Sequence, residues 1–408
     1  MILYYSAQRS ADTLVAAVPI FVEFSLTFKN KLRGLNKMPE HRTLEDNIST
    51  LEQLKCYMDL SPREAEEIEQ IAKIHPMRIS PYYLSLINWH DPHDPIKKMA
   101  VPSFEESNLE GFYDTSGESE NTKMPGLQHK YSETALILAT NRCAMYCRHC
   151  FRKRLVGLPS EEILSRFEDA AEYIRKHEEI NNVLISGGDP LVLQNDIIQS
   201  FLEALTNIDH LRFIRLGSRV PVTLPDRLAD PEILGILKKY SKSDKRVYVV
   251  TQFNHPREIT SQSINAVNNL IESGVILSNQ TVLLRGVNDN PETLADLLNG
   301  LVGIGVAPYY VFQCRPVKRV KHQFQVPVCK GVRIVEQAKA NCNGLSKRFK
   351  YAMSHKTGKI EILGIIGDEI FFKYHEAKNR ENLGLMFKRP VDENAGWLDD
   401  FKVEGNAD

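Results

Sequence analysis

The 408-residue sequence predicts an α/β fold: a partial (β/α)6 barrel, preceded by a helical N-terminal segment and followed by a C-terminal extension. From about residue 131, apolar runs of strand type alternate six times with amphipathic helical stretches, which indicates a parallel sheet covered by helices. Polar or charged residues follow every one of these strands. Because loops at the carboxyl ends of barrel strands meet at one mouth, where ligands bind, these strand ends favour the barrel over an open doubly wound sheet.

The six predicted strands are short and apolar, and they cover residues 135–140, 182–186, 213–217, 247–251, 276–284 and 308–313. Helices are predicted in the gaps, over residues 161–177, 195–206, 226–240, 260–273, 291–303 and 329–341. Several of them begin with a capping residue, as in Asn290-Pro291-Glu292. A further strand is expected over residues 360–366, beyond the barrel.

The N-terminal part of the chain is charged and helical in pattern over about residues 1–110. Ser61-Pro62-Arg63-Glu64 predicts a helix start, because Ser caps, Pro suits the first turn and Glu64 completes a capping box. Residues 111–126 are rich in Gly, Ser, Pro and acids, which predicts a linker or irregular loop. We therefore expect three regions: residues 1–127 as a helical region and linker, 128–345 as the barrel, and 346–408 as the extension.

Composition and charge exclude several classes of protein. Fifty-one Lys and Arg against 52 Asp and Glu give a net charge of −1, whereas dedicated nucleic-acid or anionic-membrane binders are usually basic. The most apolar window, Thr13 to Phe28, contains Pro19 and Glu23 and lacks the basic start of a signal peptide. The sequence predicts a soluble, cytoplasmic protein with no nucleic-acid or membrane partner.

Three of the seven cysteines, Cys143, Cys147 and Cys150, fall within eight residues, directly after the first predicted strand. Soft thiolate ligands select zinc or iron–sulfur clusters. Structural zinc sites usually close with a fourth ligand, and no second cysteine pair exists here. Three thiolates on a four-iron cluster leave one iron open, which suits catalysis. The alternative is a non-enzymatic protein with a zinc knuckle completed by the distant Cys314 or a histidine.

A second motif, Ser186-Gly187-Gly188-Asp189, ends the second predicted strand. Glycines at such a position allow a ligand to approach the backbone closely. By itself the motif also fits a plain tight turn. Its place, one βα unit after the cysteines, favours a binding loop.

The cysteine spacing, with an aromatic ring (His149) just before the last cysteine, resembles the signature of the radical S-adenosylmethionine (SAM) superfamily. The resemblance implies a [4Fe-4S] cluster whose open iron binds the amino and carboxylate groups of SAM. It also implies an electron donor such as flavodoxin or ferredoxin, and cleavage of SAM to methionine and a 5′-deoxyadenosyl radical. The motif Ser186 to Asp189 resembles the superfamily's motif for the methionine amino group.

The resemblance narrows to the lysine 2,3-aminomutase family. The blocks that carry it occur in family order over about residues 128–345: CRHCFRKR (147–154), LISGGD (184–189), GSR (217–219), FNHP (253–256), NQ (279–280), LRGVND (284–289) and PYY (308–310). This resemblance implies a partial barrel. It also implies a radical reaction that moves the α-amino group of an L-amino acid to the β-carbon, with the amino acid held on pyridoxal 5′-phosphate (PLP).

The family's site residues carry over onto matching positions. Arg152 matches the arginine that pairs with the substrate carboxylate, and Asp289 matches the aspartate that holds a lysine ammonium. Four residues fall on blocks that line the cofactor site: Ser218, Arg219, Asn254 and Gln280. From position alone, Arg152 could equally be a solvated member of a basic run, and Asp289 a turn residue.

The PLP site is where the sequence departs from the family. Lys130 and Tyr131 match two places of the phosphate-binding trio, but the third, usually arginine, is Thr134. Lys359 takes the place of the catalytic lysine that holds PLP, and Ala352 takes the place of a second substrate-binding acid. An open alternative is therefore a PLP-independent radical SAM enzyme that abstracts hydrogen from an amino acid-like substrate.

The family's intersubunit zinc site has no counterpart, because no cysteine follows Cys342. Zinc is therefore not expected, and a homo-oligomer would be held by other contacts.

Overall fold

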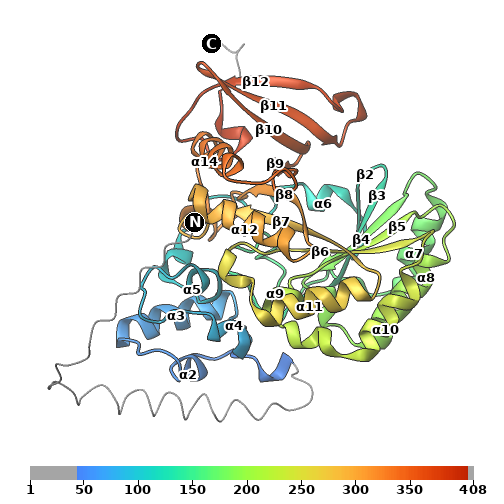
Figure 1. The fold of residues 1–408 in the computed structure, drawn as a ribbon, viewed down its shortest axis with the longest axis horizontal. Helices are drawn as coiled ribbons and strands as arrows, with labels where there is room; N and C mark the ends of the chain where they lie inside the picture. Colours follow the sequence, from blue (N-terminus) through green and yellow to red (C-terminus); the bar gives the residue numbers. More distant parts are fainter. Residues whose placement is uncertain (1–43, 403–408) are drawn as a thin grey trace, which may run out of the picture. The chain divides into compact units, whose positions relative to one another are not determined.

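A mixed sheet of twelve strands organises residues 44–402, the part of the chain that the computed structural model describes (Figure 1). The strands lie side by side in chain order. Their bounds are β1 Thr122–Met124, β2 Leu127–Tyr131, β3 Thr134–Thr140, β4 Asn182–Gly187, β5 Phe213–Gly217, β6 Arg246–Thr251, β7 Ile276–Leu283, β8 Ala307–Gln313, β9 Lys350–His355, β10 Gly358–Ile366, β11 Glu369–Ala377 and β12 Met386–Pro390. Pairing is parallel from β3 to β9 and antiparallel at both ends of the sheet, which confirms the α/β class.

Helices fill the connections between the parallel strands and lie along one side of the sheet in Figure 1. They are α7 Phe167–Lys176, α8 Asn195–Thr206, α10 Pro231–Tyr240, α11 Ser261–Glu272, α12 Pro291–Gly303 and α14 Val328–Ala340. Four of these helices and all six predicted strands match the sequence-based ranges within one residue at each end. The pattern of period 3.6 and period 2 was therefore sufficient for most of the sheet and its cover.

The two helices that differ have local causes. α7 begins at Phe167 rather than at 161, because Glu162 pairs with Arg154 and the backbone N–H of Leu164 donates to Leu138 of the neighbouring strand (2.9 Å). The range 226–240 is split into a 3-10 turn, Pro225–Ala229, and α10. Asp230 separates them, and its carboxylate caps α10 by accepting from the N–H of Glu232.

Short helices precede the sheet: α2 Leu51–Leu54, α3 Pro62–Ile74, α4 Pro81–Ser85, α5 Pro95–Ala100 and the 3-10 turn η2 Phe104–Ser107. α3 has the predicted cap, with a reciprocal capping box between Ser61 and Glu64. The connection between α3 and α4 and the end of α5 run alongside the cysteine loop. The N–H of Tyr146 donates to Arg78 O and the N–H of Arg148 to Met99 O, both at 2.9 Å.

The segment 111–126, predicted to be a linker or irregular loop, is irregular over residues 111–117 and then forms regular elements. It carries α6, Glu118–Asn121, and β1. The carboxylate of Asp114 accepts hydrogen bonds from the N–H groups of Ser116, Glu118 and Ser119, which gives the segment its own cap. Glu118 is buried as a result.

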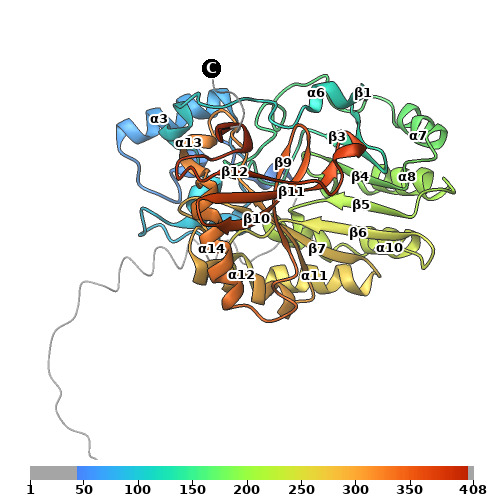
Figure 2. The same cartoon turned by 90° about the horizontal axis from the view of Figure 1, so that it is seen from above.

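The C-terminal strands extend the same sheet, since β9 pairs with β8 across the boundary expected near residue 345 (Figure 2). α14 and β9–β12 share a second hydrophobic core, into which Trp397 and Phe401 pack. Lys359 lies on β10 and faces Glu376 of β11. The extension therefore places the predicted catalytic lysine at the sheet.

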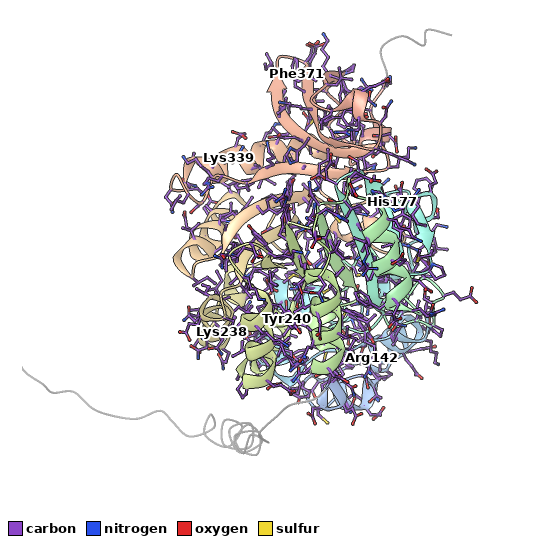
Figure 3. All side chains as sticks on the ribbon, turned by 90° about the vertical axis from the view of Figure 1, so that its right-hand side faces the viewer. Arg142, His177, Lys238, Tyr240, Lys339 and Phe371 are labelled. Carbon is purple, nitrogen blue, oxygen red and sulfur yellow. The ribbon has the colours of Figure 1, made fainter. Side chains whose placement is uncertain are left out.

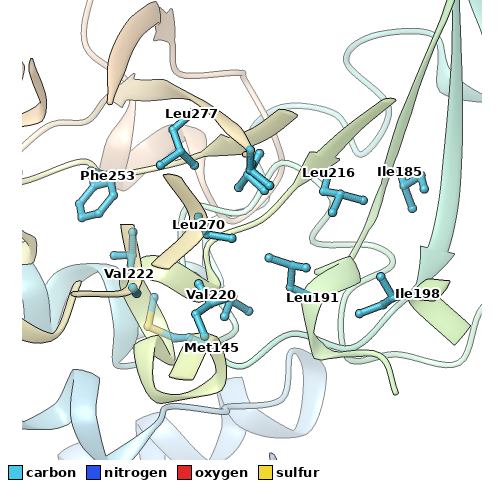
Figure 4. Close-up of a cluster of buried hydrophobic side chains, with 14 of the residues drawn as sticks. Met145, Ile185, Leu191, Ile198, Leu216, Val220, Val222, Phe253, Leu270 and Leu277 are labelled. Carbon is cyan, nitrogen blue, oxygen red and sulfur yellow. The ribbon is translucent and has the colours of Figure 1, made fainter. Parts of the chain in front are cut away.

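The main core lies between the parallel strands and the helices (Figure 4). Met145, from the cysteine loop, packs into it together with Leu216 and Val220. Side chains on the outer helices follow the amphipathic pattern: Lys238 of α10 is exposed, whereas Tyr240 is buried (Figure 3). No helix in residues 44–402 has the length and apolar character needed to cross a membrane. The window Thr13 to Phe28 lies outside the described residues.

Candidate active site

A cavity of about 350 Å³ lies at the carboxyl ends of the parallel strands. Each of the strands β3 to β8, or the loop that follows it, contributes lining residues. One lining residue from each of these strands or strand-end loops, in chain order, is Cys143, Ser186, Ser218, Gln252, Gln280 and Arg315. The polar strand ends noted in the sequence therefore do meet at one site.

Cys143, Cys147 and Cys150 all line this cavity. Burial raises the pKa of the Cys143 and Cys150 thiols, that of Cys150 to about 11, so these thiols ionise only beside a positive charge such as iron. Among the described residues, no three His, Cys, Asp or Glu side chains converge closely enough to hold one metal ion. A four-iron cluster binds each thiolate at a different iron, so the spread of the three thiols fits a cluster better than a mononuclear site.

Two buried arginines, Arg148 and Arg219, hold the cysteine loop in place. Arg148 donates Nε and Nη2 to the Glu106 carboxylate (2.7 and 2.6 Å), and Lys153 Nζ lies 2.6 Å from the same carboxylate. Burial raises the pKa of Glu106, but the charges of Arg148 and Lys153 and their hydrogen bonds outweigh burial and hold it at about 2. Arg219 Nη1 donates to Cys147 Sγ (2.7 Å), and its Nη2 donates to the buried Glu258 (2.6 Å).

The loop Ser186 to Asp189 packs directly on the start of the cysteine loop. Gly187 has a φ of +107°, and a Cβ on Gly188 would lie 2.3 Å from the carbonyl oxygen of Arg142. Asp189 accepts from the N–H groups of Leu191 (3.0 Å) and Arg219 (2.7 Å), and burial raises its pKa to about 6. The two glycines thus present bare backbone to the cavity, while Asp189 joins two strand-end loops.

Lys359 lies at the other end of the cavity. Its Nζ pairs with Glu376 (2.9 Å) and lies 4.7 Å from the ring centroid of Tyr310. Its side chain is 12% exposed. Tyr131 and Lys130 line the same end, and the hydroxyl of Tyr131 is buried without a hydrogen-bond partner. An amine beside an acid and an unused hydroxyl suit a ligand that carries both a carbonyl and an anionic group.

Arg152 also lines this cavity, which contains the cluster cysteines and Lys359. Its Nε pairs with Glu118 (3.2 Å), and its Nη1 donates to Ser186 Oγ (3.1 Å) and to Gly187 O (3.4 Å). Arg154 takes the second oxygen of Glu118 (2.7 Å). Arg152 therefore reaches the glycine-rich loop from the segment that follows the cysteines.

Comparison with known proteins identifies this arrangement. The model of the Radical SAM superfamily matches residues 137–298. A protein of Aquifex aeolicus (strain VF5) is 44% identical over 352 residues, which are 85% of this chain and 93% of its own length. The L-lysine 2,3-aminomutase of Clostridium subterminale is 41% identical over 304 residues, which are 74% of this chain and 72% of the relative.

The chain belongs to the lysine 2,3-aminomutase family of radical SAM enzymes. It is an aminomutase-type isomerase, and its superfamily works with a [4Fe-4S] cluster and SAM. Relatives in the family differ in the substrate they are named for, since a glutamate 2,3-aminomutase of Clostridioides difficile (strain 630) is 38% identical over 305 residues, 74% of this chain and 71% of the relative.

Most of the predicted site residues of this aminomutase lie at the cavity. Those on its lining are Lys130, Tyr131, Cys143, Cys147, Cys150, Arg152, Ser186, Gly187, Gly188, Asp189, Ser218, Arg219, Gln280 and Lys359. Two, Asp289 and Asn254, are not on this lining.

Asp289 is not among the residues that line the cavity: it accepts from the N–H of Gly286 (2.7 Å) and pairs with Lys330 (3.0 Å), contacts that are typical of a turn residue with a surface ion pair. Asn254 is fully buried behind the lining, where its amide donates to Met99 and contacts His149 Nε2 (3.2 Å). Asn254 therefore contacts the aromatic ring that lies beside the cluster cysteines.

Sequence reasoning missed several lining residues: Ser116, Glu118, Arg215, Arg315 and Glu376. Ser116 and Glu118 lie in the segment that had been assigned to a linker, where no local pattern signals burial. Arg315 lies two residues after the end of β8, so its place at a strand end was an available signal. Arg215, a charged residue inside a buried strand, was another.

Substitution of Gly188 by alanine is expected to weaken SAM binding by roughly 10- to 100-fold, because the new Cβ would collide with the backbone at Arg142 and push the glycine-rich loop away. The measurement is SAM affinity of anaerobically reconstituted protein. Gly235 of α10 is the matched control, since nothing lies within 4 Å of a Cβ there. Unchanged SAM affinity in Gly188→Ala would contradict a close approach of SAM to this loop.

Proposed function

We propose that this aminomutase moves the α-amino group of an L-amino acid to the β-carbon, with PLP held at Lys359. The observation that carries the proposal is one cavity lined by the cluster cysteines, by Arg152 and by Lys359. When bound, the cluster and SAM supply a 5′-deoxyadenosyl radical that removes a β-hydrogen, and PLP carries the migrating nitrogen. The cluster cysteines, Arg152 and Lys359 can serve the same substrate molecule because they line one cavity.

The residues of the chain have distinct tasks in this proposal. Arg152 brings a positive guanidinium to the substrate α-carboxylate. Its Nε and Nη1 are held by Glu118, Ser186 and Gly187, so Nη2 is the nitrogen left to donate to that carboxylate. Lys359, with Glu376 beside it, binds PLP and moves protons at its Nζ. Arg219, through Cys147, and the bare backbone of Gly187 and Gly188 hold the cluster and SAM end.

The substrate side chain is the least constrained part. Relatives are named for lysine and for glutamate. The acids that line the cavity are all engaged: Glu118 with Arg152 and Arg154, Asp189 with backbone N–H groups, and Glu376 with Lys359. The amino acids tested as substrates must therefore include glutamate and amino acids with neutral side chains as well as lysine. The test is to incubate reduced protein with SAM and this panel and to identify β-amino acid products by mass spectrometry.

Substitution of Lys359 by alanine is expected to lower β-amino acid formation by at least about 100-fold, the lower range for a positioned proton-transfer group. Borohydride should fix PLP on Lys359 in the wild-type protein, as peptide mapping would show. Lys356, which is 61% exposed and on the same hairpin, is the control and should be replaceable by alanine without effect. If Lys359→Ala keeps full turnover and PLP content, the PLP-independent alternative replaces this proposal.

We further propose four features of the whole protein. The strands β3–β8 curve into a partial barrel around the cavity, with residues 1–127 and 346–408 as flanking regions. An external one-electron donor such as flavodoxin or ferredoxin reduces the cluster. Oxygen sensitivity of an open cluster favours a reducing cytoplasm, and a homo-oligomer, if formed, uses contacts other than zinc.

A further inference from the structure

Two cations that Ser116 brings together at the Lys359 end of the cavity, Arg315 and Lys130, have no carboxylate partner among the described residues. Arg315 Nη1 donates to Ser116 Oγ (2.8 Å), and its guanidinium stacks 4.1 Å from the ring centroid of Phe151. Lys130 Nζ donates to Ser116 O (3.0 Å) and to His355 O (2.6 Å). Buried charges in proteins are normally paired, so uncompensated cations that face a cavity mark a site for an external anion.

Lys130 and Arg315 lie close to one another, because both donate hydrogen bonds to Ser116. Burial lowers the pKa of Arg315 to about 10. Burial, together with the positive charges of Arg315 and Lys378, lowers the pKa of Lys130 to about 7, and Lys359 adds to this while Glu118 opposes it. Among the acids, Glu118 has the largest effect on the pKa of Arg315, which it raises, but the carboxylate oxygens of Glu118 bind Arg152 and Arg154. The pair of cations formed by Arg315 and Lys130 therefore lacks a neutralising negative charge.

The unused hydroxyl of Tyr131 completes the group. Its oxygen is buried without a partner, and the ring of Tyr131 lies between two lysines, 5.5 Å from Lys130 Nζ and 5.8 Å from Lys359 Nζ. An anion seated on Lys130 and Arg315 would thus lie one aromatic ring away from the amine of Lys359. A guanidinium, an ammonium and a hydroxyl match the acceptor oxygens and the charge of a phosphate monoester.

We propose that Arg315, with Lys130 and the Tyr131 hydroxyl, seats the phosphate of PLP. This inference rests on the proposed use of PLP at Lys359. It moves the third phosphate-binding place away from Thr134, whose hydroxyl instead bonds the amide of Asn182 (3.1 Å) at the opposite end of β3 from the cysteines. Arg215, which also bonds Asn182, is the rival guanidinium: it lines the cavity, and its Nε is buried without a hydrogen-bond partner. Among the described residues, however, no second cation bonds the Asn182 amide, whereas Ser116 holds both Arg315 and Lys130.

The experiment compares binding of PLP with binding of pyridoxal, which lacks the phosphate, by absorbance titration of the cluster-loaded protein. Arg315→Gln should weaken PLP binding roughly 10- to 100-fold and leave pyridoxal binding within about twofold. Arg315→Lys should restore part of the PLP affinity. Lys378→Gln is the matched control, because it removes a nearby charge that pairs with Glu120 outside the cavity lining. It should change PLP affinity by no more than about threefold.

Several outcomes would overturn the inference. Equal losses of PLP and pyridoxal binding in Arg315→Gln would show a structural role for Arg315. A selective loss of PLP in Arg215→Gln but not in Arg315→Gln would place the phosphate at Asn182. A changed KM for a dicarboxylic amino acid with unchanged PLP affinity would assign Arg315 to the substrate. If wild-type protein binds no PLP, the proposed function falls as well, whereas the other three outcomes leave it standing.

Discussion

Substitution of Cys150 by alanine is expected to reduce 5′-deoxyadenosine formation from SAM to background. In the proposed site each of the three thiolates binds one iron of the cluster, and all three cysteines line one cavity with no spare cysteine pair. Loss of one ligand leaves two irons without protein support, so the cluster should assemble poorly. The measurements are iron and sulfide content after anaerobic reconstitution, and 5′-deoxyadenosine formed with dithionite as reductant.

Cys314 is the matched control for this experiment. It also lines the cavity, it is buried whereas the cluster cysteines are half-buried, and its thiol contacts the carbonyl oxygen of Arg315. Cys314→Ala should therefore retain iron and SAM cleavage. If Cys314→Ala loses metal to the same extent as Cys150→Ala, a fourth thiolate closes the site, and the open cluster assumed in the proposed reaction is wrong.

The features that could be predicted from the sequence are those set by local pattern. Strand and helix positions follow from hydrophobic period, and the cysteine spacing lies within one loop. Gly187 and Gly188 are required by backbone contacts only a βα unit away, so their motif is compact. The chemistry of the cluster end was therefore accessible from residue order alone.

The choice of ion-pair partners was not accessible in this way. Asp289 turns to Lys330, 41 residues on, and so leaves the cavity. Glu118 binds Arg152 from a segment with loop-like composition. Such pairings depend on which side chains the fold brings together, and composition near either partner gives no sign of them. The substrate end, which depends on these pairings, was for that reason the part predicted least well.

Glu106 is the clearest case of a residue that sequence pattern hides. It lies in a 3-10 turn ahead of the sheet, is fully buried, and carries the only carboxylate that the described structure places against both Arg148 and Lys153. Both cations flank the cluster cysteines. Through them, the N-terminal helices determine where the cysteine loop sits.

Substitution of Glu106 by glutamine is expected to destabilise the protein by roughly 3–5 kcal/mol, because it leaves two buried cations without a counter-charge. The measurement is the midpoint of denaturant unfolding of the protein before cluster loading, followed by iron content after reconstitution, which should also fall. Glu105→Gln, at an exposed position in the same turn, should change stability by less than about 0.5 kcal/mol. Equal stability of the two variants would mean that water or rearranged carbonyls compensate the cations. The cysteine loop would then be held by its backbone contacts to Arg78 and Met99 instead.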